Sequence, residues 1–210
     1  MTALVLATSN RKKLVELDRI LRAAGLEVDL LTLDEVEVPD VVESGATFAE
    51  NAVLKATATA AATGRTAVAD DSGLAVDALN GMPGVLSARW SGAGATDESN
   101  LRLVLDQTAD VPDDRRGAAF VCVAALAEPD GDVHTVEGRV TGHLLRAPAG
   151  DGGFGYDPIF VPHGYAVTTA QLSPADKDAI SHRGEAFRGI AAVIRAGGGT
   201  RTRTPEGTGS

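Results

Sequence analysis

The sequence predicts a mixed α/β fold, in which helices flank a central sheet. Two short apolar strands, at residues 4–7 and 66–69, each adjoin a helical pattern. Further along, the long apolar run 118–126 and the strand pattern 133–140 are separated by a Pro-Asp-Gly turn. A turn this short joins antiparallel neighbours in a hairpin, so the sheet is expected to contain both strand orientations.

The first half of the chain predicts two strands and two helices. Residues 4–7 are apolar and typical of a buried strand. Leucines at helical spacing predict a helix over residues 12–24. The segment Thr47-Phe48-Ala49-Glu50 has the spacing of a capping box, which predicts the start of an alanine-rich helix that ends at Thr63-Gly64. A short strand then follows directly.

The second half predicts three further helices and a tail. A helix is expected over residues 96–107, and Ser173-Pro174 supplies a cap and a first-turn proline for a short one. A last helix is expected over residues 183–195. Residues 197–210 are rich in glycine and threonine and have no apolar stripe, so they predict a disordered tail behind a single domain, residues 1–196.

Charge, cysteine content and the apolar N-terminal run limit the classes of protein to which this chain can belong. The net charge of -10 argues against a nucleic-acid partner, which needs clustered positive charge. The single cysteine, Cys122, lies in an apolar run and is expected to be a small core residue. The apolar run at residues 3–7 is too short for a signal peptide or a spanning helix, so we expect a cytoplasmic protein without a membrane partner.

Two adjacent carboxylates, Asp70 and Asp71, follow the strand at 66–69 and precede Ser72-Gly73. We expect the strand to end at Ala69 and the acids to lie in a turn at the sheet edge, where open α/β sheets bind ligands. Paired acids there favour a bound divalent cation, with a solvated turn as the alternative. Neighbouring strand side chains face opposite ways, so both acids reach one metal only if the chain turns at Asp70.

A polar loop, Thr8-Ser9-Asn10-Arg11-Lys12-Lys13, lies between the first strand and the first helix. Free backbone amides and the positive end of the helix would make an anion site there, to which Lys13 and the hydroxyl groups add donors. It is not a Walker loop, because the required glycines are absent. Capping of the helix by Thr8, Ser9 or Asn10, with solvated lysines, is the alternative.

The predicted second helix is dominated by alanines, and its polar residues include Asn51 and Lys55. They are four residues apart and therefore share a helix face. If that face looks into a cleft, Lys55 would meet a phosphate or hold Asp70 or Asp71 in place. An exposed Lys55 is the alternative.

Two late segments combine aromatic rings with hydrogen-bond donors. Phe154-Gly155-Tyr156-Asp157 has glycines that allow close backbone approach, which suits either a stacked nucleobase or a tight turn. Lys177 and Ser181-His182-Arg183 supply donors for a base edge or a phosphate, with a solvated helix junction as the alternative.

Taken together and in this order, the motifs resemble those of the inosine triphosphatase family over essentially residues 3–195. The resemblance is carried by Thr8-Ser9-Asn10-Arg11-Lys12-Lys13, Thr47-Phe48-x-Glu50-Asn51-Ala52-x-x-Lys55-Ala56, Ala69-Asp70-Asp71-Ser72-Gly73-Leu74, Pro83-Gly84-Val85-x-Ser87-Ala88-Arg89-Trp90-Ser91-Gly92, Gly153-Phe154-Gly155-Tyr156-Asp157-Pro158 and Ser181-His182-Arg183-Gly184. The ordered combination is far more specific than any one of these segments.

The resemblance implies both a fold and a reaction. The fold would be a mixed α/β domain with an elongated central sheet and two lobes around a central cleft, one lobe containing the hairpin, assembled as a homodimer. The reaction would be the Mg²⁺-dependent hydrolysis of non-canonical purine nucleoside triphosphates (ITP, dITP or XTP) to the monophosphate and pyrophosphate.

The resemblance also implies residue roles. Asp71 would be the catalytic proton acceptor and a metal ligand. The substrate would be bound by Thr8, Ser9, Asn10, Arg11, Lys12, Lys13, Ser72, Phe154, Gly155, Tyr156, Asp157, Lys177, His182 and Arg183. Relatives often carry two acids where this chain has Val42-Glu43, and the first of them binds metal. The second metal ligand here is therefore open between Glu43 and Asp70.

Two other functions stay open at this point. One is a phosphatase with Asp70 or Asp71 as covalent nucleophile, although the usual Asp-x-Asp spacing is missing. The other is a nucleotide sensor that hydrolyses nothing. Lys177, His182 and Arg183 are mostly donors, which suits the O6 and N7 acceptors of a 6-keto purine and leaves adenine mismatched. A metal-bound Asp71 would have a lowered pKa and be a poor base, so the alternative is that the metal acidifies the water and Asp71 or Asp70 only orients it.

Overall fold

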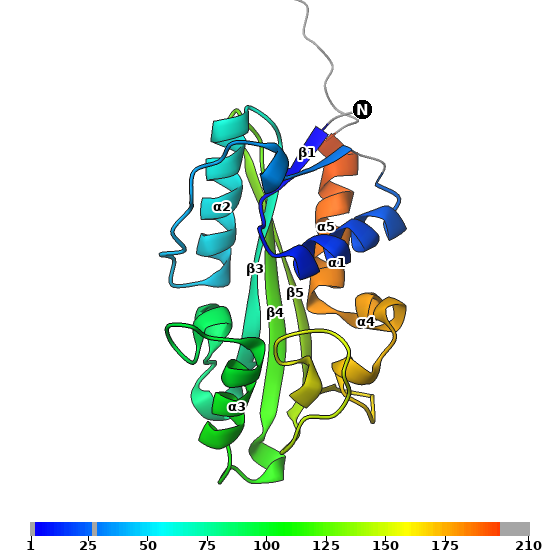
Figure 1. Cartoon of the computed structure of the whole chain (residues 1–210). Coiled ribbons are helices and arrows are strands. Elements are labelled where there is room, and N and C mark those ends of the chain that lie inside the picture. Colours follow the sequence, from blue (N-terminus) through cyan, green and yellow to red (C-terminus); the bar gives the residue numbers. More distant parts are fainter. Residues whose placement is uncertain (1–2, 27–28, 198–210) are drawn as a thin grey trace, which may run out of the picture.

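Figure 1 shows the fold, a computed structural model that describes residues 3–26 and 29–197. Its six-stranded sheet has the order β2-β1-β3-β4-β5-β6. The strands are β1 (Ala3–Leu6), β2 (Asp29–Thr32), β3 (Ala67–Val76), β4 (Gly117–Ala127), β5 (Val133–Leu144) and β6 (Phe160–Pro162). The helices are α1 (Arg11–Ala23), α2 (Phe48–Thr63), α3 (Asp97–Gln107), α4 (Pro174–Ile180) and α5 (His182–Gly197).

The sheet is mixed, as predicted. β1 runs parallel to both β2 and β3, whereas the pairs β3–β4, β4–β5 and β5–β6 are antiparallel. β4 and β5 pair from Gly117 opposite His143 to Ala127 opposite Val133, which confirms the hairpin. The three long strands β3, β4 and β5 run along the length of the molecule and give it an elongated shape (Figure 1).

Helices cover both faces of the sheet at one end, and α3 lies at the other end (Figure 1). α2 packs on β3 and β4, while α5 packs on β4 and β5 with α1 beside it. The core under α5 contains large side chains such as Phe187, together with Val68 and Cys122, and Cys122 is fully buried as predicted. The core under α2 is built mainly from alanines, such as Ala56 and Ala69.

Most predicted helix ends are confirmed. The Thr47 side chain accepts a hydrogen bond from the Glu50 amide at the start of α2, and Gly64 ends that helix in the left-handed conformation, with φ 61°. Thr96 caps α3. The capping box at Thr47 is only half formed, however, because the Glu50 carboxylate accepts from the Ala46 amide at 2.6 Å.

The predicted end of the strand at Ala69 is wrong. β3 continues without a turn to Val76 and pairs residue by residue with β4. Asp70 and Asp71 are therefore mid-strand residues. Pairing with the buried strand β4 outweighs the local preference of Asp, Ser and Gly for a turn.

β1 is much shorter than β3, and this difference creates the place for a site. β1 ends at Leu6 and pairs with β3 only at Ala67 and Val68. The edge of β3 beyond Val68 is therefore not covered by β1. The polar loop that follows β1 lies beside this edge, since Lys13 reaches Asp70 there.

Two further differences from the sequence predictions concern strands. The two short edge strands β2 and β6 have no sequence pattern that predicts them. β5 runs to Leu144 rather than to Val140, because its last residues pair with β6. The predicted tail, residues 197–210, lies outside the described residues except for Gly197, which ends α5.

Candidate active site

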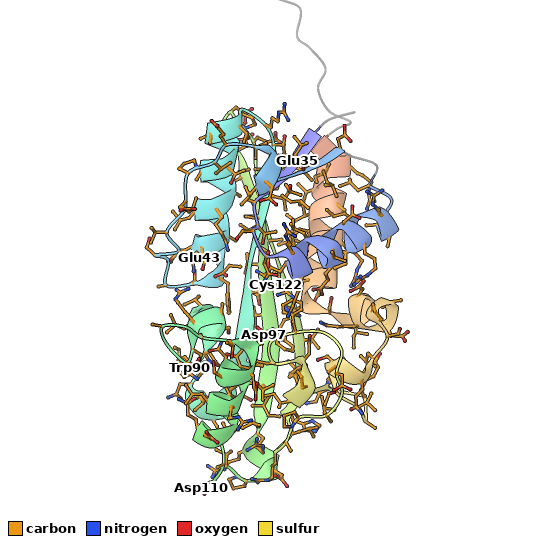
Figure 2. All side chains as sticks on the ribbon, viewed as in Figure 1. Glu35, Glu43, Trp90, Asp97, Asp110 and Cys122 are labelled. Atoms are coloured by element: carbon orange, nitrogen blue, oxygen red, sulfur yellow. The ribbon has the colours of Figure 1, made fainter. Side chains whose placement is uncertain are left out.

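A cavity of about 590 Å³ lies beside the uncovered edge of β3. The predicted site residues that line it are Thr8, Ser9, Asn10, Lys13, Glu43, Lys55, Asp71, Ser72, Phe154, Gly155, Tyr156, Asp157, His182 and Arg183. The predicted residues that are not among its described lining are Arg11, Lys12, Asn51, Asp70 and Lys177. Figure 2 shows Glu43 near the lower end of α2 and Asp97 near the upper end of α3, on either side of this region.

Helix α2 holds Asp71 in the cavity wall. Asp71 Oδ2 accepts a 3.0 Å hydrogen bond from Asn51 Nδ2, and its Oδ1 lies 3.7 Å from Lys55 Nζ. Lys55 Nζ also pairs with Glu43 Oε1 at 2.6 Å. Asn51 is itself fixed, because its Oδ1 accepts from the Gly45 amide at 2.8 Å. The four-residue spacing thus brings Asn51 and Lys55 together against Asp71.

The three ionisable groups on this side have different proton affinities. Burial raises the pKa of the Asp71 carboxyl above its ordinary value, although Lys55 and Asn51 oppose the shift. Burial also disfavours charge on Glu43 and on Lys55. Their mutual attraction nevertheless lowers the pKa of Glu43, and the negative charges of Asp70 and Asp71 help to raise the pKa of Lys55. Asp71 is therefore the group on this side best suited to accept a proton.

Asp70 belongs to the opposite face of the sheet. Its side chain is fully buried, and its Oδ2 lies 2.9 Å from Lys13 Nζ, 3.1 Å from Ser72 Oγ and 3.6 Å from Arg183 Nε. Burial opposes ionisation, but the charges of Lys13, Arg183 and Lys55 outweigh it and hold the pKa of Asp70 well below its ordinary value. Asp70 is therefore a permanent anion inside the protein.

The strand geometry corrects the expectation that Asp70 shares a metal with Asp71. Side chains alternate along a strand, and β3 has no turn at Asp70, so the two carboxylates point to opposite faces. Asp71 contacts α2 and Asp70 contacts α1. Of the two candidates for a second ligand, Glu43 is the one on the Asp71 side, because both acids contact Lys55.

The loop after β1 contributes side chains rather than free amides. Asn10 caps α1, and its Oδ1 accepts from the amides of Lys12 at 3.0 Å and Lys13 at 3.3 Å. Thr8 Oγ1 accepts from the Asn10 amide at 3.3 Å. Three amides of the loop are therefore already used, as in the capping alternative, and are not offered to an anion in this structure. Thr8, Ser9 and Lys13 still line the cavity.

Arg11 and Lys12 are exposed residues in the first turn of α1. Lys12 Nζ pairs with Asp97 Oδ2 at 3.0 Å, which links α1 to the start of α3. Both side chains of this pair are more than half exposed, at 60% and 56%. Lys12 therefore belongs to the rim of the site.

Asp157 organises the glycine-rich turn before β6. Its Oδ2 accepts from the Phe154 amide at 2.8 Å and pairs with Lys177 Nζ at 2.7 Å. Its Oδ1 accepts from Thr169 Oγ1 at 2.8 Å. Asp157 thus fixes both Lys177 and the backbone at Phe154, and has few acceptor positions left for a ligand.

The two aromatic residues of this turn differ in how deeply their side chains are buried. Tyr156 is buried, and its hydroxyl donates to the Ser87 carbonyl at 2.8 Å. Phe154 is only partly buried and lines the cavity. Lys177 Nζ and the Arg183 guanidinium lie 5.1 and 5.0 Å from the centre of its ring. Phe154 is therefore the ring of this turn that reaches both the cavity and the cationic side chains beside it.

His182 and Arg183 form the first turn of α5. Ser181 Oγ accepts from the Gly184 amide at 2.8 Å and so caps the helix. The His182 ring stacks on Phe120, with 4.9 Å between centroids and 11° between planes. Burial, together with the charge of Arg183, keeps the pKa of His182 well below its ordinary value. His182 is therefore neutral and offers one donor and one acceptor.

The sequence model of the Ham1 family matches residues 4–193, nearly the whole described chain. The chain belongs to the Ham1 family. It is 57% identical over 196 residues to a protein named dITP/XTP pyrophosphatase from Streptomyces coelicolor, covering 93% of this chain and 98% of that one. It is 53% identical over 194 residues to a protein of the same name from Mycobacteroides abscessus, covering 91% and 94%. The family is the one that the ordered motifs predict.

Solved structures of Ham1 proteins have the same fold. A HAM1 protein from Coxiella burnetii matches with a TM-score of 0.85 and 42% identity, covering 93% of this chain and all of that chain, 100%. A crystal structure titled nucleoside-triphosphatase / dITP/XTP pyrophosphatase from Mycobacterium abscessus matches with a TM-score of 0.75 and 52% identity, covering 92% and 99%. The mixed α/β fold is thereby confirmed. No helix in the described ranges 3–26 and 29–197 is long and apolar enough to cross a membrane.

The structure adds site residues of this Ham1 protein that sequence reasoning missed. Glu16 is buried and pairs with Arg183, with Nη1 and Oε2 3.1 Å apart. Arg183 Nη2 also donates to Ser72 Oγ at 2.8 Å. The sequence pattern of α1 does not reveal Glu16 as a site residue, because an acid next to a leucine stripe usually faces solvent. Asp97 and Ser87 also line the cavity, and both belong to conspicuous polar segments.

The side chains that line the Ham1 cavity can hold a metal ion only if the substrate or water supplies further ligands. Within the residues that the structure describes, no three Asp, Glu, His or Cys side chains are placed to hold a metal ion. Two carboxylates, Asp71 and Glu43, line the cavity on one side. Mg²⁺ in nucleotide enzymes is typically bound by one or two carboxylates plus phosphate oxygens and water. Asp71 and Glu43 therefore fit a Mg²⁺ ion that arrives with a polyphosphate.

Proposed function

We propose that this protein hydrolyses ITP, dITP and XTP to the nucleoside monophosphate and pyrophosphate. The observation that carries the proposal is the contrast between the two ends of one cavity. One end has Asp71 and Glu43 beside Lys55, and the other has Phe154 beside Arg183. Membership of the Ham1 family, whose similar members are named dITP/XTP pyrophosphatase, supports the same reaction.

The acidic end suits the reacting phosphate and its metal. Asp71 and Glu43 would hold Mg²⁺, which when bound neutralises phosphate charge and orients the α-phosphate for attack by water. Lys55 lies between both acids and would meet the phosphate chain as it enters. Glu43 Oε2 also accepts a long hydrogen bond of 3.4 Å from Arg89 Nη1, and each carboxylate oxygen has two lone pairs, so both acids keep lone pairs for a cation.

Asp71 would accept the proton of the attacking water. The water oxygen forms a bond to the α-phosphorus, the bond to the β-phosphate oxygen breaks, and pyrophosphate leaves. Burial raises the pKa of Asp71 when no metal is bound, and a bound Mg²⁺ would lower the pKa of both the carboxylate and the attacking water. Asn51 fixes the carboxylate by donating to Oδ2, so that its other oxygen can face the water.

The departing pyrophosphate would be stabilised by Lys13, with Thr8 and Ser9 as hydroxyl donors. Lys13 Nζ gives one contact to Asp70 at 2.9 Å, and an ammonium has three donors. Two of them remain for phosphate oxygens. Because the amides of Lys12 and Lys13 are capped by Asn10, side chains would carry this interaction.

The base would stack on Phe154 and be read by Lys177, His182 and Arg183. Lysine and arginine only donate, and neutral His182 donates through one nitrogen. A 6-keto purine offers acceptors at O6 and N7, whereas adenine places a donor at position 6. Each buried group left unpaired costs about 1–3 kcal/mol, so two mismatches would disfavour ATP by tens to about ten-thousand-fold.

We also propose that the enzyme is a cytoplasmic homodimer that uses Mg²⁺ and has neither a nucleic-acid nor a membrane partner. The homodimer, the metal and the cytoplasm follow from the family resemblance. The net charge of -10 supports the lack of a nucleic-acid partner. Sedimentation of the purified chain with and without duplex DNA would test the assembly and the partner together.

Product analysis with ITP, dITP, XTP, ATP and GTP tests the proposed function. Inosine monophosphate plus pyrophosphate from ITP supports it, and a chelator such as EDTA should abolish the release. Orthophosphate with a trapped phosphoaspartate would instead indicate an aspartyl-phosphate phosphatase. Intact ITP, bound but unchanged in the presence of Mg²⁺, would indicate a nucleotide sensor.

A further inference from the structure

Asp70 is an acid of the site that does not face the cavity. It is 1% exposed and is not among the described residues that line the cavity, although its neighbours Asp71 and Ser72 are. Cys122 Sγ lies 3.9 Å from Asp70 Oδ2, and Figure 2 shows Cys122 at the centre of the sheet. Asp70 can therefore affect the site only through its neighbours, and several of the side chains that it contacts do line the cavity.

One oxygen of Asp70 joins residues from three elements. Oδ2 lies 2.9 Å from Lys13 Nζ on α1, 3.1 Å from Ser72 Oγ on β3 and 3.6 Å from Arg183 Nε on α5. Arg183 Nη2 closes the group by donating to Ser72 Oγ at 2.8 Å. Lys13 and Arg183 both line the cavity, and the proposed function assigns Lys13 to the phosphate chain and Arg183 to the base. Asp70 is thus the counter-ion that the two ends share.

The surrounding network is balanced in charge but incomplete in hydrogen bonds. Asp70 and Glu16 carry two negative charges, and Lys13 and Arg183 carry two positive ones. In the described part of the chain, the buried side-chain atoms without a hydrogen-bond partner are Glu16 Oε1, Asp70 Oδ1 and Arg183 Nε. All three belong to this network. Arg183 Nε lies just beyond hydrogen-bond distance of Asp70, so a small displacement would complete the pair.

We propose that Asp70 is a positioning residue that couples the phosphate end of the cavity to the base end. A triphosphate that draws Lys13 partly away from Asp70 frees this carboxylate to hold Arg183 more tightly. Arg183 is then fixed beside Phe154, where the base is read. This role rests on the proposed function, because it assigns the two ends of the cavity to phosphate and base.

Binding titrations of matched variants test this coupling without turnover. The probes are tripolyphosphate for the phosphate end, and inosine and adenosine monophosphates for the base end, all with Mg²⁺. The variants are Asp70→Asn, Lys13→Met, the double variant of both, and Asp178→Asn as control. Asp178 is another buried aspartate in an ion pair, with Arg19 of α1, but it does not line the cavity.

Asp70→Asn should weaken tripolyphosphate binding about tenfold, because Lys13 loses the partner that holds it at the cavity, and should reduce the preference for the inosine nucleotide about tenfold, because Arg183 loses the same partner. Electrostatics alone predicts the opposite sign for tripolyphosphate, because the substitution removes a negative charge. Lys13→Met should weaken tripolyphosphate binding without lowering the base preference, because it leaves Asp70 free to hold Arg183. Asp178→Asn should leave both quantities unchanged. A preference ratio does not depend on the folded fraction, so a merely structural role would not move it.

The double variant keeps the network neutral and decides the case if Asp70→Asn alone does not fold. Relative to Lys13→Met, it should bind tripolyphosphate equally well but lose base preference about tenfold. Unchanged base preference, or tighter tripolyphosphate binding by Asp70→Asn, would overturn the role. A wild-type chain that binds both probes but releases no pyrophosphate from ITP would refute the proposed function and not the coupling.

Discussion

Two neighbouring aspartates of β3 occupy opposite environments. Asp71 faces α2 and the cavity, beside Lys55 and Asn51, and burial raises its pKa. Asp70 faces α1 and α5, fully enclosed, and the charges of Lys13 and Arg183 help to hold its pKa down. The same side chain is therefore suited to accept a proton at one position and to remain an anion at the next.

This difference shows how the alternation of side chains along a strand can give two adjacent residues different roles. A continuous strand sends adjacent side chains to opposite faces, and each face of this sheet carries its own helices. The α2 face supplies one lysine to two acids, Asp71 and Glu43. The other face supplies Lys13 and Arg183 to Asp70. The closeness of the cations, rather than the identity of the acid, decides the role, since Lys55 Nζ lies 3.7 Å from Asp71 whereas Lys13 Nζ lies 2.9 Å from Asp70.

The largest effect is expected from Asp71→Asn. The amide cannot accept the proton of water, so kcat should fall by about 10²–10⁴-fold. Binding of inosine monophosphate should stay near the wild-type value, because the substituted side chain keeps the shape of the carboxylate and its amide oxygen can still accept from Asn51. Steady-state kinetics with ITP and calorimetry with the monophosphate measure the two quantities. If the variant keeps a tenth of the wild-type kcat, Asp71 is not the base.

The fold is largely predictable from local sequence signals. Thr47, Thr96 and Gly64 mark helix ends through side-chain caps and a left-handed glycine, and these signals act within a few residues. The length of β3 is not local, because it depends on pairing with β4 some fifty residues later. An Asp-Asp-Ser-Gly segment has turn propensity, which a buried partner strand overrides.

The next effect is expected from Gly138→Val, which tests whether α5 must sit close to the sheet on the Asp70 side. A Cβ at Gly138 would meet the His182 carbonyl oxygen and lie 2.7 Å from the Ala186 amide. The added side chain should cost about 1–3 kcal/mol or more in the free energy of unfolding, because backbone atoms must move. It should also lower the preference for inosine over adenosine monophosphate, since Arg183 shifts with the helix.

Gly197→Ala is the matched control at the far end of the same helix, where a Cβ would meet nothing within 4 Å. It should leave the denaturant midpoint and base preference nearly unchanged. Equal behaviour of the two variants would show that close packing at Gly138 does not position the first turn of α5.

The candidate site is only partly predictable from the sequence, because it too depends on contacts between distant parts of the chain. Sequence spacing finds Asn51 and Lys55, because both lie on one helix face. It does not find Glu16, whose partner Arg183 is 167 residues away. It also cannot say which of two adjacent acids faces the cavity until the strand boundary is known. Contacts set by tertiary packing are invisible to local patterns.

A smaller effect, on stability at mildly acidic pH, is expected from His182. Its pKa is lowered in the folded state by burial and by Arg183, so below its ordinary pKa the unfolded chain binds the proton more readily. Stability should therefore fall as the pH decreases below about 6.5, by at most about 1.4 kcal/mol per pH unit. Asp70 contributes no slope there, because its lowered pKa makes its contribution disappear only in stronger acid.

Urea unfolding of the wild type and of His182→Gln between about pH 7.5 and 5.5 measures this slope. The variant should have the flatter dependence, whatever its absolute stability. Parallel curves for the two proteins would mean that His182 is not the buried neutral group that faces Phe120.

The smallest effect is expected from Asp97→Asn, which removes the exposed pair with Lys12 at the rim. Both side chains are more than half exposed, at 60% and 56%, so the pair should contribute less than about 1 kcal/mol to stability. Its removal also deletes a negative charge from the cavity lining, which should speed the capture of an anionic nucleotide at low ionic strength. We expect kcat/KM for ITP to rise a few-fold at low salt and the difference to vanish near ~1 M salt, where the screening length is about 3 Å. Asp70→Asn, inside the protein, should keep its effect on base preference at both salt concentrations. If Asp97→Asn retained its effect at high salt, the rim pair would act through structure and would resemble the buried network.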